Sequence, residues 1–459
     1  MEELVPPQEA DPAPESGELL EKSLRLLDFH AIRGQLASHA TFFPARQLAL
    51  QLMPSHGSLE VEELQRETAE GRALLQRPGD FSLHVSEDVL PAVNRAALDG
   101  ILSGTELMAV ADSLEVQWRV KRAILRARQS GQDIPLLSGI AEAVPDLREL
   151  QGQIRARIGN RGEVLDDATP TLRALRGQVR GSYERVTQSL TRVIQSSVGQ
   201  EALQDQVISM RGDRLVVQVK SEMRHRVPGI VHDASNTGAT LFIEPFATVE
   251  LCNTWRELAL EEEREVTRVL RELSTLAGVL ADDIRRGVDL AARLDFILAR
   301  ARYSESMQGV SALPPGARRR AEATTEVRLL NARHPLLGEA AVPISVNIGH
   351  GWSVLVITGP NTGGKTVAMK TVGLLALMHQ AGLQVPADEG SALPVFQGIY
   401  ADVGDQQSIE HSVSTFSSHM RSVIDILAEA GPDSLVLLDE LGTSTDPEEG
   451  SALAKAILG

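Results

Sequence analysis

The feature that most restricts the fold of this chain is the octapeptide GPNTGGKT at residues 359–366, which satisfies the pattern G-x-x-x-x-G-K-[ST]. The apolar run at 354–358 precedes it and predicts a buried strand, and helical spacing follows it through Met378. Strand, loop and helix in this order form the context in which the pattern binds phosphate. A chance glycine-rich turn is the alternative, but it would not explain both flanking elements. The sequence therefore predicts an α/β domain with a P-loop.

The residues of this loop suit a nucleoside triphosphate. Its glycines let backbone N–H groups approach phosphate oxygens, and the helix N-terminus adds partial positive charge. Lys365 is expected to neutralise the β- and γ-phosphates, and Thr366 to supply a hydroxyl ligand to Mg²⁺. ATP and Mg²⁺ are therefore the predicted cofactors. The predicted binding residues are Gly359, Pro360, Asn361, Thr362, Gly363, Gly364, Lys365 and Thr366.

A second apolar run, at 434–438, ends in Asp439 and Glu440. After a P-loop, this pattern indicates a Walker B strand, in which Asp439 would bind Mg²⁺ and Glu440 would polarise the attacking water. Between the two motifs lies a serine-rich stretch at 407–420. Its hydroxyls suit a second phosphate contact across a dimer interface, although such clusters also mark helix caps and loops.

The remainder of the chain has mostly helical spacing. Thr169 and Pro170 predict the N-cap and first position of a helix with an apolar seam, and 249–303 predicts an almost unbroken second helix. Between them, β-type runs predict a small sheet. An arm of two paired helices carrying a β clamp is expected, and an ordinary helical bundle is the alternative. The expected domains are a disordered acidic tail at 1–17, a helical core or lever domain at 18–168, the coiled-coil arm and clamp at 169–303 with its β module near 204–250, a linker at 304–325, and an incomplete α/β P-loop domain at 326–459.

Composition narrows the setting. The single Cys252 excludes an intramolecular disulfide, and one thiol cannot build a multi-cysteine zinc site. The N-terminus lacks the basic and apolar segments of a signal peptide, and no run of 18 apolar residues predicts a membrane helix. A cytoplasmic protein without membrane association is therefore expected.

A net charge of −17 means that nucleic-acid binding would require a local basic patch. The candidate patch lies in the β region, and a solvated charged hairpin is its alternative reading. No aromatic stacking pattern accompanies it, so contact with the phosphate backbone is favoured over base readout. The predicted nucleic-acid residues are Arg211, Arg214, Lys220, Arg224 and Arg226.

Several runs resemble one family. TGPNTGGKTVAMKTVGLL, DVGDQQSIEHSVSTFSSHM and LVLLDELGTSTDPEEGSALA are similar to the ATPase domain of the MutS superfamily, in particular its second bacterial paralogue, the MutS-two family. NARHPLL at 331–337 and the clamp run GIVHDASNTGATLFIEP resemble that family as well. The resemblance extends from roughly residue 20 to 459.

This resemblance implies a homodimeric ATPase in which Ser414 reaches the γ-phosphate of the partner subunit. The implied catalytic residues are Lys365, Ser414, Asp439 and Glu440, and the implied metal ligands are Thr366 and Asp439. The implied ligands of the clamp are branched DNA, through which such proteins suppress homologous recombination, and for some members collided ribosomes and their rRNA.

Three departures from the family pattern qualify this reading. Mismatch-reading MutS proteins open with a domain that carries a Phe-x-Glu wedge, and no such domain is expected before the lever helices here. Phe242-Ile-Glu244 matches that tripeptide only by accident, because it lies on a predicted clamp strand. The sequence also stops before the family's nuclease domain and before the strand that carries a switch histidine. We therefore expect a truncated chain with a loosely ordered head, weak ATP hydrolysis and no endonuclease activity of its own.

Two alternatives come from other classes. A structural coiled-coil ATPase of the chromosome-maintenance or break-repair class would insert its coils between the Walker motifs, whereas here the coils precede both. A clamp that binds nucleotide as a switch without hydrolysing it would be distinguished by measuring turnover.

Overall fold

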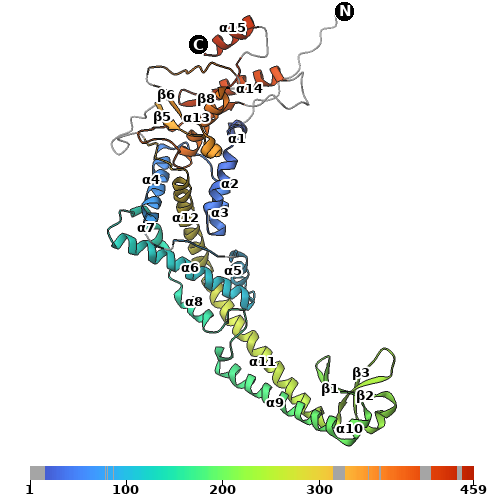
Figure 1. Ribbon diagram of the computed structural model, residues 1–459. Coiled ribbons are helices and arrows are strands. Elements are labelled where there is room, and N and C mark those ends of the chain that lie inside the picture. The colour runs from blue at the N-terminus through green and yellow to red at the C-terminus, as the bar shows by residue number, and fades with distance from the viewer. Residues whose placement is uncertain are drawn as a thin grey trace, which may run out of the picture. The chain divides into compact units, whose positions relative to one another are not determined.

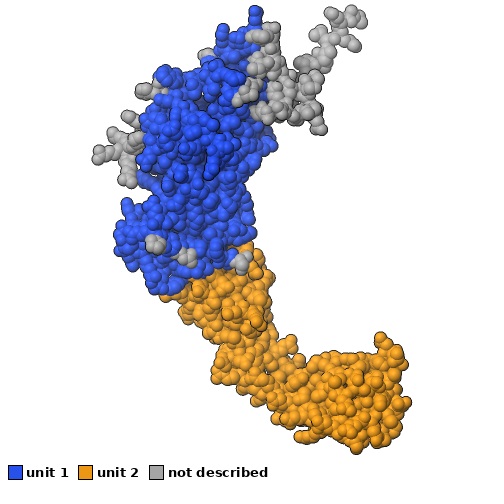
Figure 2. All heavy atoms as spheres, viewed as in Figure 1, with its two compact units in different colours: residues 1–86, 116–144, 286–459 blue, residues 87–115, 145–285 orange. Residues whose placement is uncertain are grey.

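The computed structural model describes residues 16–77, 79, 81–85, 87–313, 326–349, 351–360, 363–403, 415–441 and 447–458. The chain is mostly helical with small sheets. It forms two compact units, each built from segments that are distant in sequence (Figure 2). Unit 1 contains residues 1–86, 116–144 and 286–459, and unit 2 contains 87–115 and 145–285. Among the described helices, none combines the length and apolarity that crossing a bilayer requires.

Two long helices of unit 2, α9 (Pro170–Gln195) and α11 (Phe246–Val279), pack side by side (Figure 1). The predicted start of α9 is confirmed, since Thr169 Oγ1 accepts a hydrogen bond from the N–H of Leu172 at 3.0 Å. An N-cap of this kind satisfies a backbone donor that the helix leaves unpaired. The buried apolar residues of these helices include Leu172, Val186 and Leu190 of α9 and Val269 and Leu273 of α11.

The expected, almost unbroken helix over 249–303 is interrupted only at Leu280, where α11 ends at Val279 and α12 (Ala281–Ser306) begins. A close contact accompanies this end. A Cβ at Gly278 would lie 2.3 Å from the carbonyl oxygen of Ala96, at the end of α5 (Leu90–Ala97). Glycine therefore admits the α5 backbone at this position, where any side chain would collide with it.

Between α9 and α11 the chain forms a four-stranded antiparallel sheet of order β1-β2-β4-β3. One face carries Val217, Val219 and Ile243, which pack against Val186 and Leu190 of α9. The sheet thus shares its hydrophobic core with the end of the helix pair. The strands are β1 (Leu203–Arg211), β2 (Arg214–Lys220), β3 (Gly229–Ala234) and β4 (Thr240–Pro245).

The remaining elements of unit 2 are short, and two longer helices contribute residues to both units. The short elements are α8 (Arg148–Arg155), α10 (Ser197–Ala202) and the 3-10 turns η1 (Asp166–Ala168) and η2 (Ser221–Arg226). The shared helices are α6 (Gly104–Gln129) and α12.

In the helical part of unit 1, α12 is fixed by buried polar contacts. The fully buried Asp295 carboxylate accepts hydrogen bonds from the N–H groups of Thr41 and Phe42, at 2.6 and 2.7 Å, where α3 begins. A carboxylate at a helix start satisfies free donors and interacts favourably with the helix dipole. The helices of this part are α1 (Ser16–Leu26), α2 (Phe29–His39), α3 (Phe43–Leu50), α4 (Ser58–Leu75) and α7 (Pro135–Ala143).

Within the described residues, the rest of unit 1 contains two small sheets and three α-helices. An antiparallel pair, β5 (Val327–Ala332) and β6 (Ile344–Ile348), is separated by η3 (Pro335–Ala340), and a parallel pair joins β7 (Gly398–Asp402) to β8 (Ser434–Leu438). The helices are α13 (Lys365–Gln380), α14 (Thr415–Glu429) and α15 (Pro447–Leu458).

The expected buried strand at 354–358 is wrong. These residues form no strand, and the side chains from Val354 to Ile357 are 39% to 65% exposed. A strand is stabilised by ladder hydrogen bonds to a neighbour, and within the described ranges neither small sheet provides one to this segment. The apolar composition is therefore insufficient to form the strand.

The first helix packs against this α/β part. The N–H of Ala401 in β7 donates to Ser23 Oγ of α1 at 3.1 Å, and Leu27 lies against Gly373 of α13. A Cβ at Gly373 would lie 2.4 Å from a methyl group of Leu437 in β8 and 2.9 Å from one of Leu27. The close packing of α1, α13 and β8 therefore depends on a glycine here.

Candidate functional site

The predicted phosphate loop lies at the N-terminus of α13, whose first residue is Lys365. Gly364 precedes it with φ of +78°, a conformation that side chains disfavour. Lys365 Nζ donates to the carbonyl oxygen of Gly359 at 2.5 Å, and the N–H of Gly363 bonds Pro360 O at 2.9 Å. The Lys365 ammonium therefore lies over the loop. Asn361 and Thr362 fall outside the described residues.

Both predicted metal ligands come together at this helix end. Thr366 Oγ1 donates to Asp439 Oδ2 at 2.5 Å, although the two residues are far apart in sequence. β8 ends at Leu438, so the next residue, Asp439, extends from the strand toward the first turn of α13. A hydroxyl and a carboxylate are hard oxygen donors of the kind that Mg²⁺ prefers. The donor set therefore fits a magnesium ion.

Glu440 follows with an unusual backbone. Its φ is +49°, and its N–H donates to Asp439 Oδ1 at 3.0 Å. A non-glycine residue in this conformation costs about 1–2 kcal/mol, and such strain is concentrated at functional sites. The turn directs Glu440 away from the strand direction immediately after the metal-ligand position.

The serine-rich stretch is described only where it enters α14 at Thr415. Ser414 lies outside the described residues, so its phosphate contact stays a prediction.

Asp402 belongs to the same region but was missed by sequence reasoning. It ends β7, and its carbonyl oxygen accepts the N–H of Asp439 at 3.1 Å. Its carboxylate contacts His419, Ser422 and Lys22. The sequence carries a signal for it, because β7 ends in an aspartate and β8 is followed by one. The two strands are parallel, and the carboxyl ends of parallel strands meet at one sheet edge.

A comparison with known protein families matches the segment that contains this site. The family described as MutS domain V matches residues 355–459, the segment that contains α13, β7, α14, β8 and α15. The chain belongs to the MutS superfamily. It is 43% identical over 436 residues to "Endonuclease MutS2" of Geobacillus sp. (strain WCH70), covering 95% of this chain and 55% of that protein.

Other relatives with the same name give similar values. The Pelotomaculum thermopropionicum protein is 44% identical over 95% of this chain and 54% of its own length. The Clostridioides difficile protein is 39% identical over 95% of this chain and 54% of its own length. The chain thus spans about half the length of the MutS-superfamily relatives that it matches.

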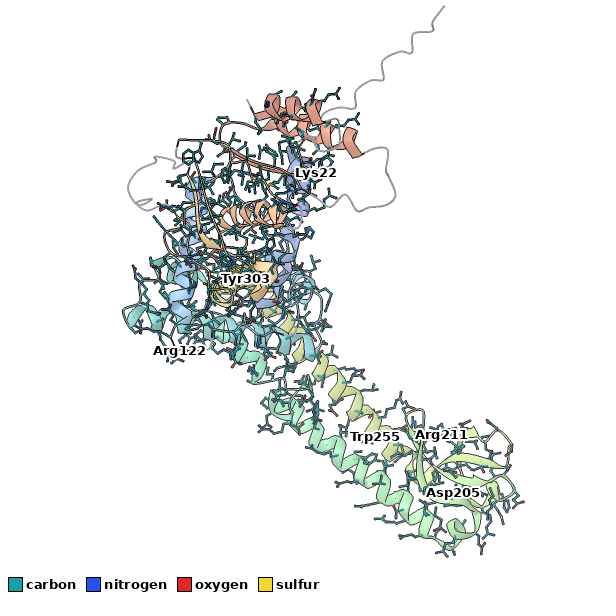
Figure 3. All side chains as sticks on the ribbon, turned by 45° about the horizontal axis from the view of Figure 1, so that its top comes forward. Lys22, Arg122, Asp205, Arg211, Trp255 and Tyr303 are labelled. Atoms are coloured by element: carbon teal, nitrogen blue, oxygen red, sulfur yellow. The ribbon has the colours of Figure 1, made fainter. Side chains whose placement is uncertain are left out.

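The five predicted nucleic-acid residues of this MutS-superfamily chain lie in or next to the unit 2 sheet, where Figure 3 labels Arg211. Arg211 pairs with Asp233 at 3.2 Å, and its guanidinium lies 3.7 Å from the ring centroid of Phe242. Arg214 contacts the buried carboxylate of Glu244 at 3.3 Å. These two arginines are therefore held by residues of the sheet itself.

The other three differ in their partners. Lys220 Nζ donates to the carbonyl oxygen of Glu201 at 3.2 Å, and Arg226 pairs with the Glu201 carboxylate at 3.3 Å. Arg224 is exposed, and its guanidinium makes no hydrogen bond or ion pair with any residue that the structure describes. Local acids thus offset much of the predicted basic cluster and leave Arg224 as its most available cation.

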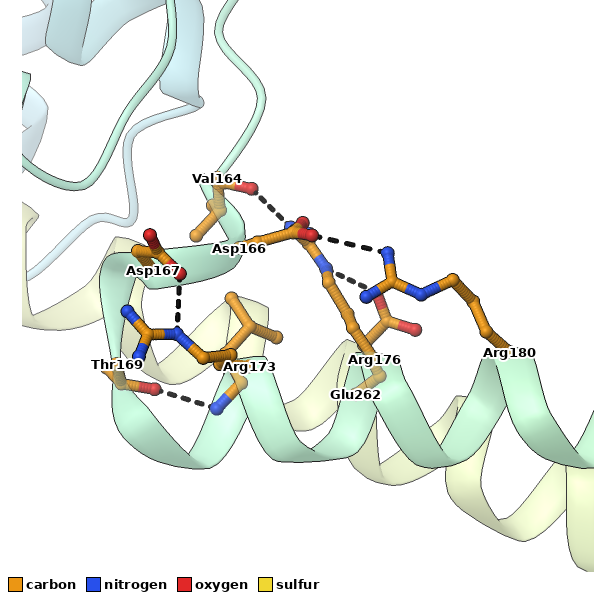
Figure 4. Close-up of polar contacts among 9 residues, drawn as sticks. Val164, Asp166, Asp167, Thr169, Arg173, Arg176, Arg180 and Glu262 are labelled. Carbon is orange, nitrogen blue, oxygen red and sulfur yellow. Dashed lines mark hydrogen bonds and ion pairs between the residues drawn. The ribbon is translucent and has the colours of Figure 1, made fainter.

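A second basic group, not predicted from sequence, lines the first turns of α9 (Figure 4). Arg176 donates to Asp166 at 2.5 Å and to Glu262 of α11 at 2.8 Å, while Arg180 contacts Asp166 at 3.3 Å. Arg173 donates to Asp167 at 2.6 Å. Hydrogen bonds from Arg176 and then Arg180 hold the pKa of Asp166 below its usual value. The network ties η1 to α9 and α11.

Proposed function

We propose that this chain binds ATP with Mg²⁺ at the N-terminus of α13 and hydrolyses it. The observation that carries the proposal is the contact of Thr366 with Asp439 beside Lys365, which joins the two Walker motifs at one place. Membership of the MutS superfamily, whose members are ATPases, supports it. The exposed 354–358 segment does not weaken this contact, because neither Thr366 nor Asp439 belongs to it.

Each residue of the site has a distinct role in this proposal. Lys365 offsets the β- and γ-phosphate charge, and Thr366 and Asp439 hold the metal ion. When bound, Mg²⁺ withdraws charge from the phosphate oxygens. Glu440 orients the attacking water and accepts its proton. Ser414 completes the site from the partner subunit of a homodimer.

We further propose that nucleotide binding controls how tightly the unit 2 sheet binds nucleic acid. The relatives are named endonucleases, which supports DNA as the partner. Branched DNA is the proposed substrate form, recombination suppression the proposed role, and ribosomal RNA a second candidate ligand. We place the protein in the cytoplasm and assign the endonuclease activity to no residue of this chain.

Equilibrium binding of ATP to Lys365→Ala tests the site. Loss of the main phosphate counter-charge is expected to weaken binding at least tenfold, or about 1.4 kcal/mol. Lys455→Ala, on the exposed face of α15, is the matched control and should bind as the wild type does. Equal affinity in all three proteins would reject the assignment.

A further inference from the structure

Asp402 lies one hydrogen bond from the proposed metal ligand. Its carbonyl oxygen accepts the N–H of Asp439 at 3.1 Å, at the point where β7 and β8 end side by side. Asp402 is only 7% exposed. Because the backbone N–H of Asp439 is held from this side, a shift of Asp402 would move the Asp439 carboxylate as well.

The Asp402 carboxylate is held at both oxygens. Oδ2 contacts His419 Nδ1 at 2.7 Å, and Oδ1 accepts the Ser422 hydroxyl at 2.9 Å, both from α14. Lys22 of α1 lies 3.7 Å from Oδ1 and donates to the Ser422 hydroxyl. A carboxylate withdrawn from water needs such charge-assisted partners, and those partners fix its orientation.

Lys22 brings the N-terminal helix into this network (Figure 3). The contact is not isolated, since Ser23 Oγ bonds the N–H of Ala401, the residue before Asp402, at 3.1 Å. Asp28, just beyond α1, pairs with Lys370 of α13 at 2.9 Å. The segment formed by α1 and Asp28 is thus attached both to β7 and to the helix that begins with Lys365.

We infer that Asp402 is a positioning residue for the metal ligand Asp439, held in place by His419 and Ser422 of α14 and by Lys22 of α1. The inference rests on the proposed ATP and Mg²⁺ site. Loss of a group that orients a metal ligand mainly lowers the affinity for the metal ion and changes other contacts of the site much less. Removing them should therefore impair the use of Mg²⁺ while leaving metal-free nucleotide binding intact.

The test compares Lys22→Met and Asp402→Asn with wild type. Arg128→Met is the matched control, because it removes an exposed ion pair of unit 1 with Glu142, away from Asp402. Both test variants are expected to raise the Mg²⁺ concentration for half-maximal turnover by roughly tenfold. The affinity for nucleotide in EDTA should stay within about twofold of wild type, well under 1 kcal/mol. Arg128→Met should change neither quantity.

A second readout does not depend on activity. Amide hydrogen exchange in the nucleotide-free protein should show faster exchange at the N–H of Asp439 in both test variants, because its acceptor has become less well fixed. Unchanged exchange together with an unchanged Mg²⁺ requirement would overturn the inference. An equal loss of metal-free nucleotide binding would also overturn it, since it would indicate a general structural defect.

The outcomes separate this inference from the proposed function. If wild type neither binds nor hydrolyses ATP, the proposed function fails, and altered Asp439 exchange still reports whether Asp402 positions that residue. If wild type is active and Lys365→Ala is not, but Lys22→Met behaves as wild type, the positioning role alone fails. Should Asp402→Asn not fold, Ser422→Ala replaces it, because it keeps the carboxylate and removes only one donor.

Discussion

Glu67 and Arg300 form a buried ion pair in unit 1. Arg300 is 1% exposed, its Nη2 donates to Glu67 Oε2 at 2.5 Å, and Arg293 donates to the other carboxylate oxygen at 2.7 Å. Burial lowers the pKa of Arg300, and the Glu67 carboxylate opposes that effect. The pair joins α4 to α12, so its integrity matters for the packing of the helical part of unit 1.

Glu67→Gln is expected to destabilise the protein by about 3 kcal/mol, because it leaves the Arg300 charge buried without a counter-charge. Urea denaturation measures this change. Glu142→Gln, which removes the acid of an exposed pair, should cost under about 0.5 kcal/mol. Equal effects of the two substitutions would show that the Glu67 environment is more hydrated than the structure indicates.

At the scale of single elements, Thr169 and Glu265 join the start of α9 to α11. Glu265 Oε1 accepts the Thr169 hydroxyl at 2.7 Å, and Arg268 donates to both carboxylate oxygens. Hydrogen bonds from Arg268 and then Thr169 lower the pKa of Glu265 to about 2. The ionised carboxylate is thus more favourable in the folded protein than in the unfolded chain.

The sign of the pH effect follows from that lowered pKa. The ionised Glu265 carboxylate contributes its full stabilisation at pH values above the pKa of 4.5 that it has in the unfolded chain. This stabilisation is lost as the pH falls toward the folded-state pKa of about 2. Wild type should therefore exceed Glu265→Gln in unfolding free energy at pH 6, and the difference should vanish near pH 2. Chemical denaturation of both proteins across this range measures it. A difference that is independent of pH would contradict the assigned contacts.

Among the basic residues of the unit 2 sheet, Arg224 should contribute most to phosphate contact. Arg224→Ser is expected to reduce the slope of log affinity against log salt by about 0.9 on duplex DNA, the value for one phosphate contact. Arg126→Ser, an exposed arginine of α6 in unit 1, is the control. Binding to linear duplex and four-way junction over a range of KCl concentrations provides the measurement. An unchanged slope would place the contact on other residues.

Local sequence signals predicted some elements well and others poorly. The Thr169-Pro170 signal gave the correct start of α9, because an N-cap depends on neighbouring residues alone. The strand at 354–358 depends on a ladder partner, and the need for glycine at 278 depends on the close approach of Ala96, neither of which is encoded locally. Asp402 was missed although each strand end carries an aspartate, because that signal is informative only once β7 and β8 are known to be parallel neighbours.

At the scale of the whole molecule, segments that are far apart in sequence belong to one unit. Residues 16–26 form α1 against β7, so the first helix and the matched MutS domain V share unit 1. The P-loop and Walker B motifs predicted a shared site for Thr366 and Asp439, and the structure brings these two side chains into contact, while their roles stay predictions. The attachment of α1 has no such motif and could be found only from the fold.

The measurement that tests the central claim most directly is ATP turnover with and without Mg²⁺ in wild type, Glu440→Gln and Lys365→Ala. We expect slow, Mg²⁺-dependent hydrolysis by wild type. Glu440→Gln should retain ATP binding but lose at least tenfold in rate, and Lys365→Ala should lose both binding and hydrolysis. Binding without turnover in wild type would indicate a nucleotide-gated clamp, and turnover that survives both substitutions would contradict the proposed ATP site at the start of α13.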